Sequence, residues 1–214
     1  MASGRFFADD CRSQDRLARE WTKLVGTNPF IPAYQSDIGK YAYAVSAPPD
    51  TTTYQLKSYK PPQAFEFTCL WKKHTASIQG NFELWFAAQG ASLITSYAIR
   101  FMLINDAEII AYNYNAVCRS STKAYTASYP FADDTWYNIK VRFDGNKLMA
   151  KWWARGTSEP GWLLDSDSGF AVVVAGSWPN RNGMINLGFY RVGAGESYAV
   201  ADIRITPIRR AGWP

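Results

Sequence analysis

The stretch "WYNIKVRFDGNKLMAKWWA", residues 136 to 154, alternates apolar with polar side chains on both sides of a tight turn. From Tyr137 to Phe143 every second residue is apolar, and the residues between them are Asn, Lys and Arg. A period of two is typical of a strand with one buried face. Asp-Gly-Asn at 144–146 is favoured in hairpin turns, and the alternation resumes after it. The stretch therefore predicts a β-hairpin.

Strand-like segments surround this hairpin. They lie at residues 40–47, 64–73, 81–89, 97–105, 108–117, 170–178, 183–192 and 198–208. About ten strands with no clear helix between them predict an all-β fold, an antiparallel sandwich of two sheets.

Residues 13–25 are ambiguous. Ser13 is a suitable cap for a short helix in which Leu17 and Trp21 fall at helical spacing. The same residues fit an irregular entry into a first strand equally well.

The composition limits the function classes. Hydrophobic residues make up 47% of the 214, charged residues 19% and aromatic residues 16%, which argues against disorder and favours β structure. The net charge is +5, but no Lys or Arg run exceeds a pair, so we expect no nucleic-acid partner. No apolar stretch approaches the length of a membrane span, and we expect no membrane partner.

The cysteines are Cys11, Cys69 and Cys118, an odd number without CxxC spacing. We expect all three to be reduced, and Cys69 to be buried because it falls in the apolar alternation of its strand. The start, "MASGRFFADDC", has no apolar core of a signal peptide, so we expect folding in a reducing cytoplasm.

Residues 130–205 resemble the closing half of a concanavalin A-like jelly roll of the laminin-G-like kind. The matching features are Trp136-Tyr137, Gly145, Leu148 to Trp153, Gly156, Glu159-Pro160, Trp162, Gly183 to Gly188 and Asp202-Ile203. The opening segments "FFADD" and "REWTKLVG" resemble the first strand and the Trp-Thr of that family. The resemblance implies residues 1–30 as an N-terminal arm or first strand, 31–208 as the jelly roll, and 209–214 as a tail.

Three tryptophans follow the hairpin turn. Trp152 shares a face with the apolar residues of its strand and is predicted to lie in the core. Trp153 falls on the opposite face, which is either solvated or covered by a loop. In the resembling family this loop folds back on its sheet, so we expect Trp162 to pack there and Trp153 to be the better candidate for a ligand face.

The predicted glycan-binding residues combine aromatic rings with amide and guanidinium donors, which suit sugar rings and hydroxyls. They are Trp153, Trp178, Asn180, Arg181, Tyr112 and Tyr114. The alternative for the 176–183 loop is a simple connection.

The resemblance also implies a structural calcium between the first and last strands. Asp10 and Asp202 are the candidate ligands, with Asp9 as an alternative to Asp10. The competing interpretation is that these carboxylates cap turns and pair with Arg204 or Arg5.

Signatures of catalysis are few. The single histidine, His74, is predicted at a strand end or in a turn. The paired carboxylates on one strand that serve glycosidases of this fold are absent: Glu83 stands alone, and Asp106 and Glu108 are interpreted as turn residues.

We therefore expect a non-enzymatic bacteriophage virion protein, a capsid decoration or a tail or fibre component, with a lectin-like domain. Expected partners are other virion proteins and host-surface polysaccharide, and a homo-oligomer is left open. The alternatives are a stand-alone carbohydrate-binding module and a glycoside hydrolase or lyase of the same fold.

Overall fold

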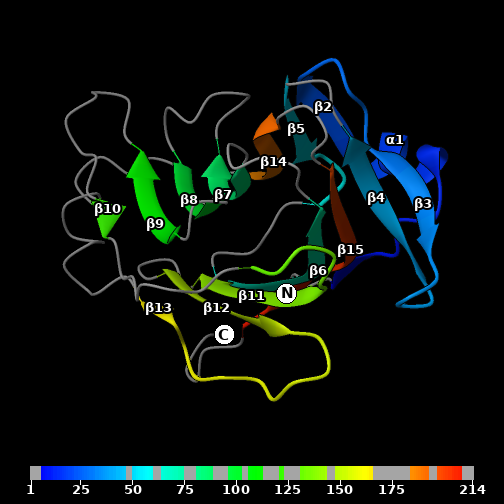
Figure 1. Cartoon of the computed structure of the whole chain (residues 1–214). Helices are drawn as coiled ribbons and strands as arrows, with labels where there is room; N and C mark the ends of the chain where they lie inside the picture. The colour runs from blue at the N-terminus through cyan, green and yellow to red at the C-terminus, as the bar shows by residue number, and fades with distance from the viewer. Residues whose placement is uncertain are drawn as a thin grey trace.

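The computed structural model describes residues 6–46, 50–59, 64–74, 81–88, 96–102, 106–112, 121–122, 131–143, 148–165, 184–192 and 197–208. The strands form two antiparallel sheets that lie as two layers (Figure 1). This confirms the two-sheet sandwich predicted from the alternation.

The eight-stranded sheet holds the first and last strands of the described chain. Its order is β13 (Leu164–Asp165), β12 (Leu148–Ala154), β11 (Tyr137–Phe143), β6 (Phe65–His74), β15 (Ser197–Pro207), β4 (Lys40–Ser46) and β3 (Ile31–Gln35), with β1 (Phe7–Asp9) paired to β15. The predicted hairpin is confirmed, since Tyr137 pairs with Ala154 and Phe143 with Leu148.

The seven-stranded sheet covers the other side of the core. Its order is β10 (Ser121–Thr122), β9 (Asp106–Tyr112), β8 (Ser96–Met102), β7 (Asn81–Ala88), β14 (Met184–Val192), β5 (Asp50–Leu56) and β2 (Trp21–Val25). The interpretation of Asp106 and Glu108 as turn residues is wrong, because β9 begins at Asp106. The predicted strand at 170–178 lies outside the described residues.

Both expectations for residues 13–25 are met in succession. Helix α1 (Gln14–Glu20) begins after Ser13, whose hydroxyl accepts a hydrogen bond of 3.2 Å from the Arg16 amide. Strand β2 follows at once with Trp21, which is buried. The first 25 residues therefore contribute β1 to one sheet and β2 to the other. In the described part of the chain no helix is long and apolar enough to span a membrane.

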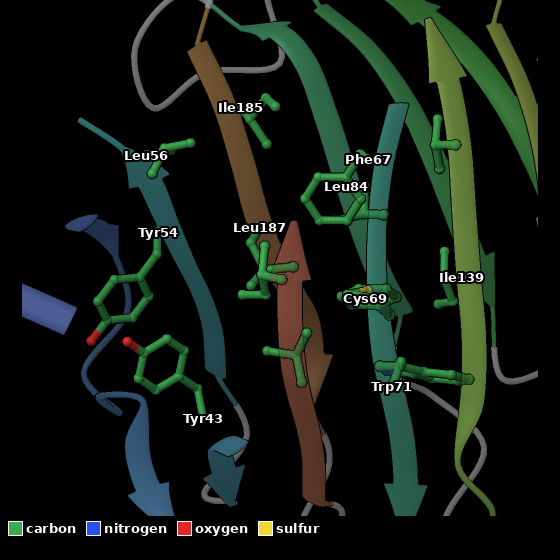
Figure 2. Packing of buried hydrophobic residues seen from close by; sticks show 14 of the residues in the cluster. Tyr43, Tyr54, Leu56, Phe67, Cys69, Trp71, Leu84, Ile139, Ile185 and Leu187 are labelled. Atoms are coloured by element: carbon green, nitrogen blue, oxygen red, sulfur yellow. The ribbon is translucent and has the colours of Figure 1, made fainter. Parts of the chain in front are cut away.

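Aromatic and aliphatic side chains together fill the core between the sheets, and Figure 2 shows part of this cluster. Trp71 of β6 stacks on Phe82 of β7 with centroids 5.4 Å apart, and Phe189 of β14 stacks on Tyr198 of β15 at 4.9 Å. Each pair joins the two sheets, so much of the aromatic content is used to bury the inner faces. Trp152 also lies in this core, as predicted.

Candidate functional site

The outer face of the eight-stranded sheet carries the candidate site. Phe67, Cys69 and Trp71 of β6 point into the core, so the alternating Thr68 and Leu70 lie on the opposite face. The same alternation on β11 and β12 places Asn138 and Trp153 beside them. The strand register confirms this, because Asn138 pairs with both Leu70 and Trp153.

A pocket of about 270 Å³ lies on this face, and Trp153 forms one of its walls. The residues that line it are Lys40, Thr68, Cys69, Leu70, Asn138, Ile139, Trp153, Arg155, Asp202 and Arg204. Trp153 is neither fully buried nor fully exposed, and it is the one aromatic residue in the lining of this pocket. The pocket combines one aromatic wall, an amide, a hydroxyl and four charged side chains.

Asp202 occupies a β-bulge at the far side of the pocket. The register of β15 against β6 shifts between Ala201 and Arg204, and Asp202 has a φ of 51°. A positive φ is uncommon outside glycine and recurs at functional sites. Lys40 Nζ lies 2.5 Å from Asp202 Oδ2, and Arg204 Nε donates to Oδ1 at 2.9 Å.

These partners set the ionisation of the carboxyl. Burial by itself would raise the pKa of Asp202, but hydrogen bonds from Lys40 and Arg204 outweigh it and hold the pKa below its ordinary value. Asp202 is therefore anionic at neutral pH and already paired with two cations.

A second pocket of about 380 Å³ meets the first at Lys40, Asp202 and Arg204. Its remaining lining residues are Asp10, Arg12, Tyr34, Gly39 and Tyr41. Tyr34 and Tyr41 are exposed and form an edge-to-face pair with centroids 5.3 Å apart.

The residues predicted to hold calcium line this second pocket together, but their surroundings do not fit a cation. Asp10 Oδ2 lies 2.9 Å from Arg12 Nε, and Asp10 Oδ1 lies 3.6 Å from Arg16 Nη1. Asp202 is held by Lys40 and Arg204. Because each carboxylate already faces two cations, Ca²⁺ would have to displace these pairs, and the ion-pair interpretation describes the arrangement better.

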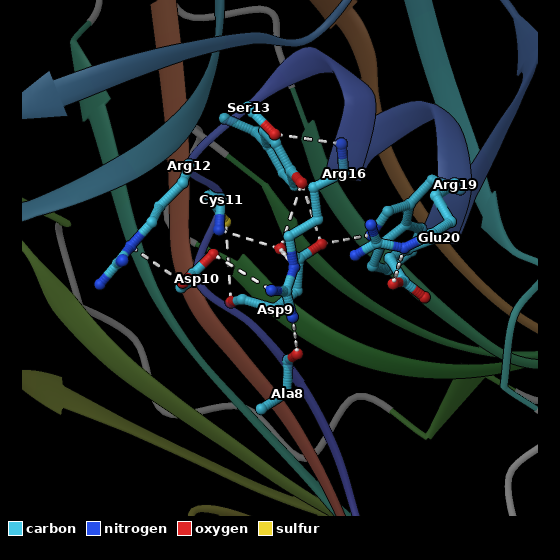
Figure 3. Close-up of polar contacts among 11 residues, drawn as sticks. Ala8, Asp9, Asp10, Cys11, Arg12, Ser13, Arg16, Arg19 and Glu20 are labelled. Atoms are coloured by element: carbon cyan, nitrogen blue, oxygen red, sulfur yellow. Dashed lines mark hydrogen bonds and ion pairs between the residues drawn. The ribbon is translucent and has the colours of Figure 1, made fainter.

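Asp9, the alternative ligand, is a structural residue (Figure 3). Its carboxylate is 1% exposed and accepts hydrogen bonds from the Cys11 amide, the Trp21 indole and the Tyr43 hydroxyl. Arg16 Nε lies 3.0 Å from its Oδ1. Within the described residues no group of three or more His, Cys, Asp or Glu side chains is placed to hold a metal ion.

Trp162 packs as predicted, over the outer face of its own sheet. The segment between β12 and β13 runs along that side (Figure 1). The Trp162 ring lies 4.6 Å from Lys151 Nζ and 5.1 Å from the Arg142 guanidinium. Glu159 anchors the loop through ion pairs of 2.6 Å to Lys151 and 2.8 Å to Lys140.

Of the predicted glycan-binding residues the structure describes two, Trp153 and Tyr112, and these two lie in different sheets. Trp153 faces outward from the eight-stranded sheet, whereas Tyr112 ends β9 in the seven-stranded sheet. Tyr114, Trp178, Asn180 and Arg181 lie outside the described residues.

Five further polar or charged residues that line the pocket were not predicted as site residues: Lys40, Thr68, Asn138, Arg155 and Arg204. Each comes from a different segment, so only the alternation that places Asn138 and Trp153 on one face could have indicated part of the set.

The seven-stranded sheet also carries buried polar groups on the side away from the core. Glu83 is 1% exposed and accepts a 2.7 Å hydrogen bond from the Trp85 indole. On neighbouring strands, the Gln55 amide donates to Asn186 at 3.0 Å. The sequence indicated Glu83 only as an isolated acid.

Two antiparallel sheets in this order form a sandwich of the concanavalin A-like fold. No family model matches the sequence, and no curated protein is significantly similar to it in sequence. Solved structures do resemble it. The VIP36 exoplasmic/lumenal domain in a Ca²⁺/Man-bound form has a TM-score of 0.65 at 10% identity, over 91% of this chain and 85% of that one.

Two further structures resemble this chain over most of their length. The carbohydrate binding module CBM66 from Bacillus subtilis has a TM-score of 0.57 at 13% identity, over 87% of this chain and 95% of the module. The Emp46p carbohydrate recognition domain has a TM-score of 0.55 at 10% identity, over 90% of each chain. These likenesses establish the fold.

Proposed function

We propose that this chain is a carbohydrate-binding protein that holds a glycan in the outer-face pocket beside Trp153 and does not act on it as an enzyme. The observation that carries this proposal is that the partly exposed Trp153 lines a pocket together with Asn138 and Thr68. An aromatic face suits the apolar face of a sugar ring, and the polar groups suit its hydroxyls.

The structural neighbours support the same class of function. CBM66 is a carbohydrate binding module, the Emp46p structure is a carbohydrate recognition domain, and the VIP36 domain is in a Ca²⁺/Man-bound form. The fold thus serves glycan recognition in other proteins. In this chain the outer-face pocket beside Trp153 is the proposed glycan-binding site.

The test is a glycan array followed by calorimetric titration of the best ligand. Trp153→Ala is expected to abolish binding and to leave the melting temperature nearly unchanged. Leu163→Ala is the matched control, because Leu163 is an exposed apolar residue of the same region but does not line the pocket. Unchanged binding by Trp153→Ala would place any glycan site elsewhere.

We further propose, from the sequence resemblance, that the protein is a component of a bacteriophage virion and is assembled in the host cytoplasm. Its partners would then be other virion proteins and host-surface polysaccharide. Mass spectrometry of purified particles tests this placement, and capsid or tail genes beside its own gene would support it.

Two other functions are alternatives to a virion protein that binds glycans. A stand-alone carbohydrate-binding module agrees with the likeness to CBM66. A hydrolase or lyase would need a pair of carboxylates, either on one strand, as Asp106 and Glu108 are on β9, or from different strands, with Glu83 as a buried candidate. An activity screen on polysaccharides with wild type and Glu83→Gln separates the enzyme from both binding classes.

A further inference from the structure

The charges around the outer-face pocket are unequal. Three cations line it, Lys40, Arg155 and Arg204, against the single carboxylate of Asp202. Lys40 and Arg204 are both paired with that carboxylate. The pocket therefore carries an excess of two positive charges, which disfavours a bound cation and favours an anion.

Arg155 is the cation that stays uncompensated. Its Nη1 donates to the Asp37 backbone carbonyl at 3.2 Å, and in the described part of the chain it has no carboxylate partner. Its backbone amide donates to the Trp136 carbonyl at 2.7 Å, so the residue continues the ladder of β12. Arg155 lies two positions after Trp153, which places both on the outer face.

From this geometry we infer that the ligand of the pocket is an acidic glycan, with a uronate carboxylate bound by Arg155 beside the sugar ring that contacts Trp153. This inference rests on the proposed carbohydrate-binding function and specifies its ligand. A guanidinium presents two parallel N–H donors that match a planar carboxylate, and such a pair is stronger than a neutral hydrogen bond.

The span of the site suits an oligosaccharide. From Trp153 on β12 the lining residues continue across β11 and β6 to Arg204 on β15. Three steps between neighbouring strands amount to about 14 Å. Asp202 and Lys40 then lie at the far end, where paired charges can accept and donate hydrogen bonds to hydroxyls.

The experiment is a calorimetric titration with oligogalacturonate and with its methyl ester, which has the same rings without the charge. We expect the acid to bind at least about tenfold more tightly than the ester. Dextran and dextran sulfate are the control pair for general attraction to polyanions. Binding of the acid is expected to persist in EDTA, since Asp202, the carboxylate of this pocket, is paired with Lys40 and Arg204.

The variants separate charge from geometry. Arg155→Gln is expected to weaken acid binding about ten- to hundredfold and to leave ester binding nearly unchanged, while Arg155→Lys restores only part of the loss. Lys23→Gln removes an exposed cation from β2 in the other sheet and is expected to have no effect.

Each contrary outcome has a distinct meaning. Equal affinity for acid and ester, or loss of binding in EDTA, overturns the acidic-glycan inference and leaves glycan binding standing. Equal binding of dextran sulfate and oligogalacturonate also overturns it. If the screened glycans, neutral and acidic, all fail to bind wild type, the proposed function itself fails.

Discussion

The Asp9 carboxylate accepts a 2.8 Å hydrogen bond from the indole nitrogen of Trp21, and this bond joins the two sheets at the start of the chain. Asp9 ends β1 in the eight-stranded sheet, and Trp21 begins β2 in the seven-stranded sheet. Both residues are buried, so the bond is protected from water.

Replacing Asp9 should therefore destabilise the fold strongly. Asp9→Asn keeps the shape but removes the charge that faces Arg16, and we expect a loss of about 3–5 kcal/mol in the free energy of unfolding. Chemical denaturation measures it. Asp10→Asn is the matched control: Asp10 is 44% exposed, and its loss should cost less than about 1 kcal/mol. Equal losses for the two variants would contradict the role of Asp9.

The three tryptophans of residues 151–162 should differ in their contribution to stability. Trp152→Ala opens a core cavity and should cost about 3–5 kcal/mol. Trp162→Ala loses contacts with Lys151 and Arg142 on a partly exposed face and should cost about 1–2 kcal/mol. Trp153→Ala should cost no more than about 0.5 kcal/mol, since Trp153 lines a surface pocket. Thermal denaturation gives the order, and a loss for Trp153 as large as that for Trp152 would refute a ligand-face role.

Acid should weaken the fold partly through Asp202. Its pKa is lowered in the folded state, so its contribution is fully present above the unfolded pKa of about 3.9 and is lost as pH falls through the folded value. The free energy of unfolding should fall less with acid in Asp202→Asn than in wild type, by of the order of 1 kcal/mol. Asparagine tolerates the positive φ, which makes it the suitable substitution.

The Glu159 carboxyl should contribute less than Asp202 to the pH dependence of stability. Hydrogen bonds from Lys140 and Lys151 lower the pKa of its carboxyl, but the side chain is 42% exposed and water screens its charge. Glu159→Gln should therefore flatten the stability curve between pH 5 and 2 less than Asp202→Asn does. The curve is measured by urea unfolding at each pH, and the opposite order would contradict the assignment.

The cysteines should be protected from thiol reagents in the native protein. Cys11 and Cys69 are free and buried, and burial raises the pKa of each thiol well above its ordinary value. Alkylation at pH 8 followed by peptide mass spectrometry should label neither until denaturant is added. Rapid native labelling of Cys69 would show that the core opens there. This extends the prediction of reduced cysteines, which stays untested for Cys118.

The sequence predicted the elements whose signals are local. The hairpin at 137–154 was evident because Asp-Gly-Asn is favoured in hairpin turns and the segments on both sides of it alternate. Strands β3 and β5 were missed for physical reasons: "IPAYQ" is an edge strand with a proline, and "DTTTYQL" buries threonines where apolar residues are expected.

The candidate site was only partly predictable. Trp153 could be placed on an outer face from alternation alone. Its partners Lys40, Thr68 and Arg204 come from strands far apart in the sequence, and the pairing of β11 with β6, of β6 with β15 and of β15 with β4 brings them together. Nothing in a single strand's pattern records that order.

The central position of β15 has a consequence for the timing of folding. Residues 197–207 pair with β6, β4 and β1, so the eight-stranded sheet stays in three parts until this late segment is available. During synthesis the hairpin of β11 and β12 can pair with β6, but the paired strands β3 and β4 have no strand that joins them to β6. Such distant pairings close slowly and leave strand edges exposed. The protein should therefore complete its fold only after β15 has emerged from the ribosome, and depend until then on protection from aggregation.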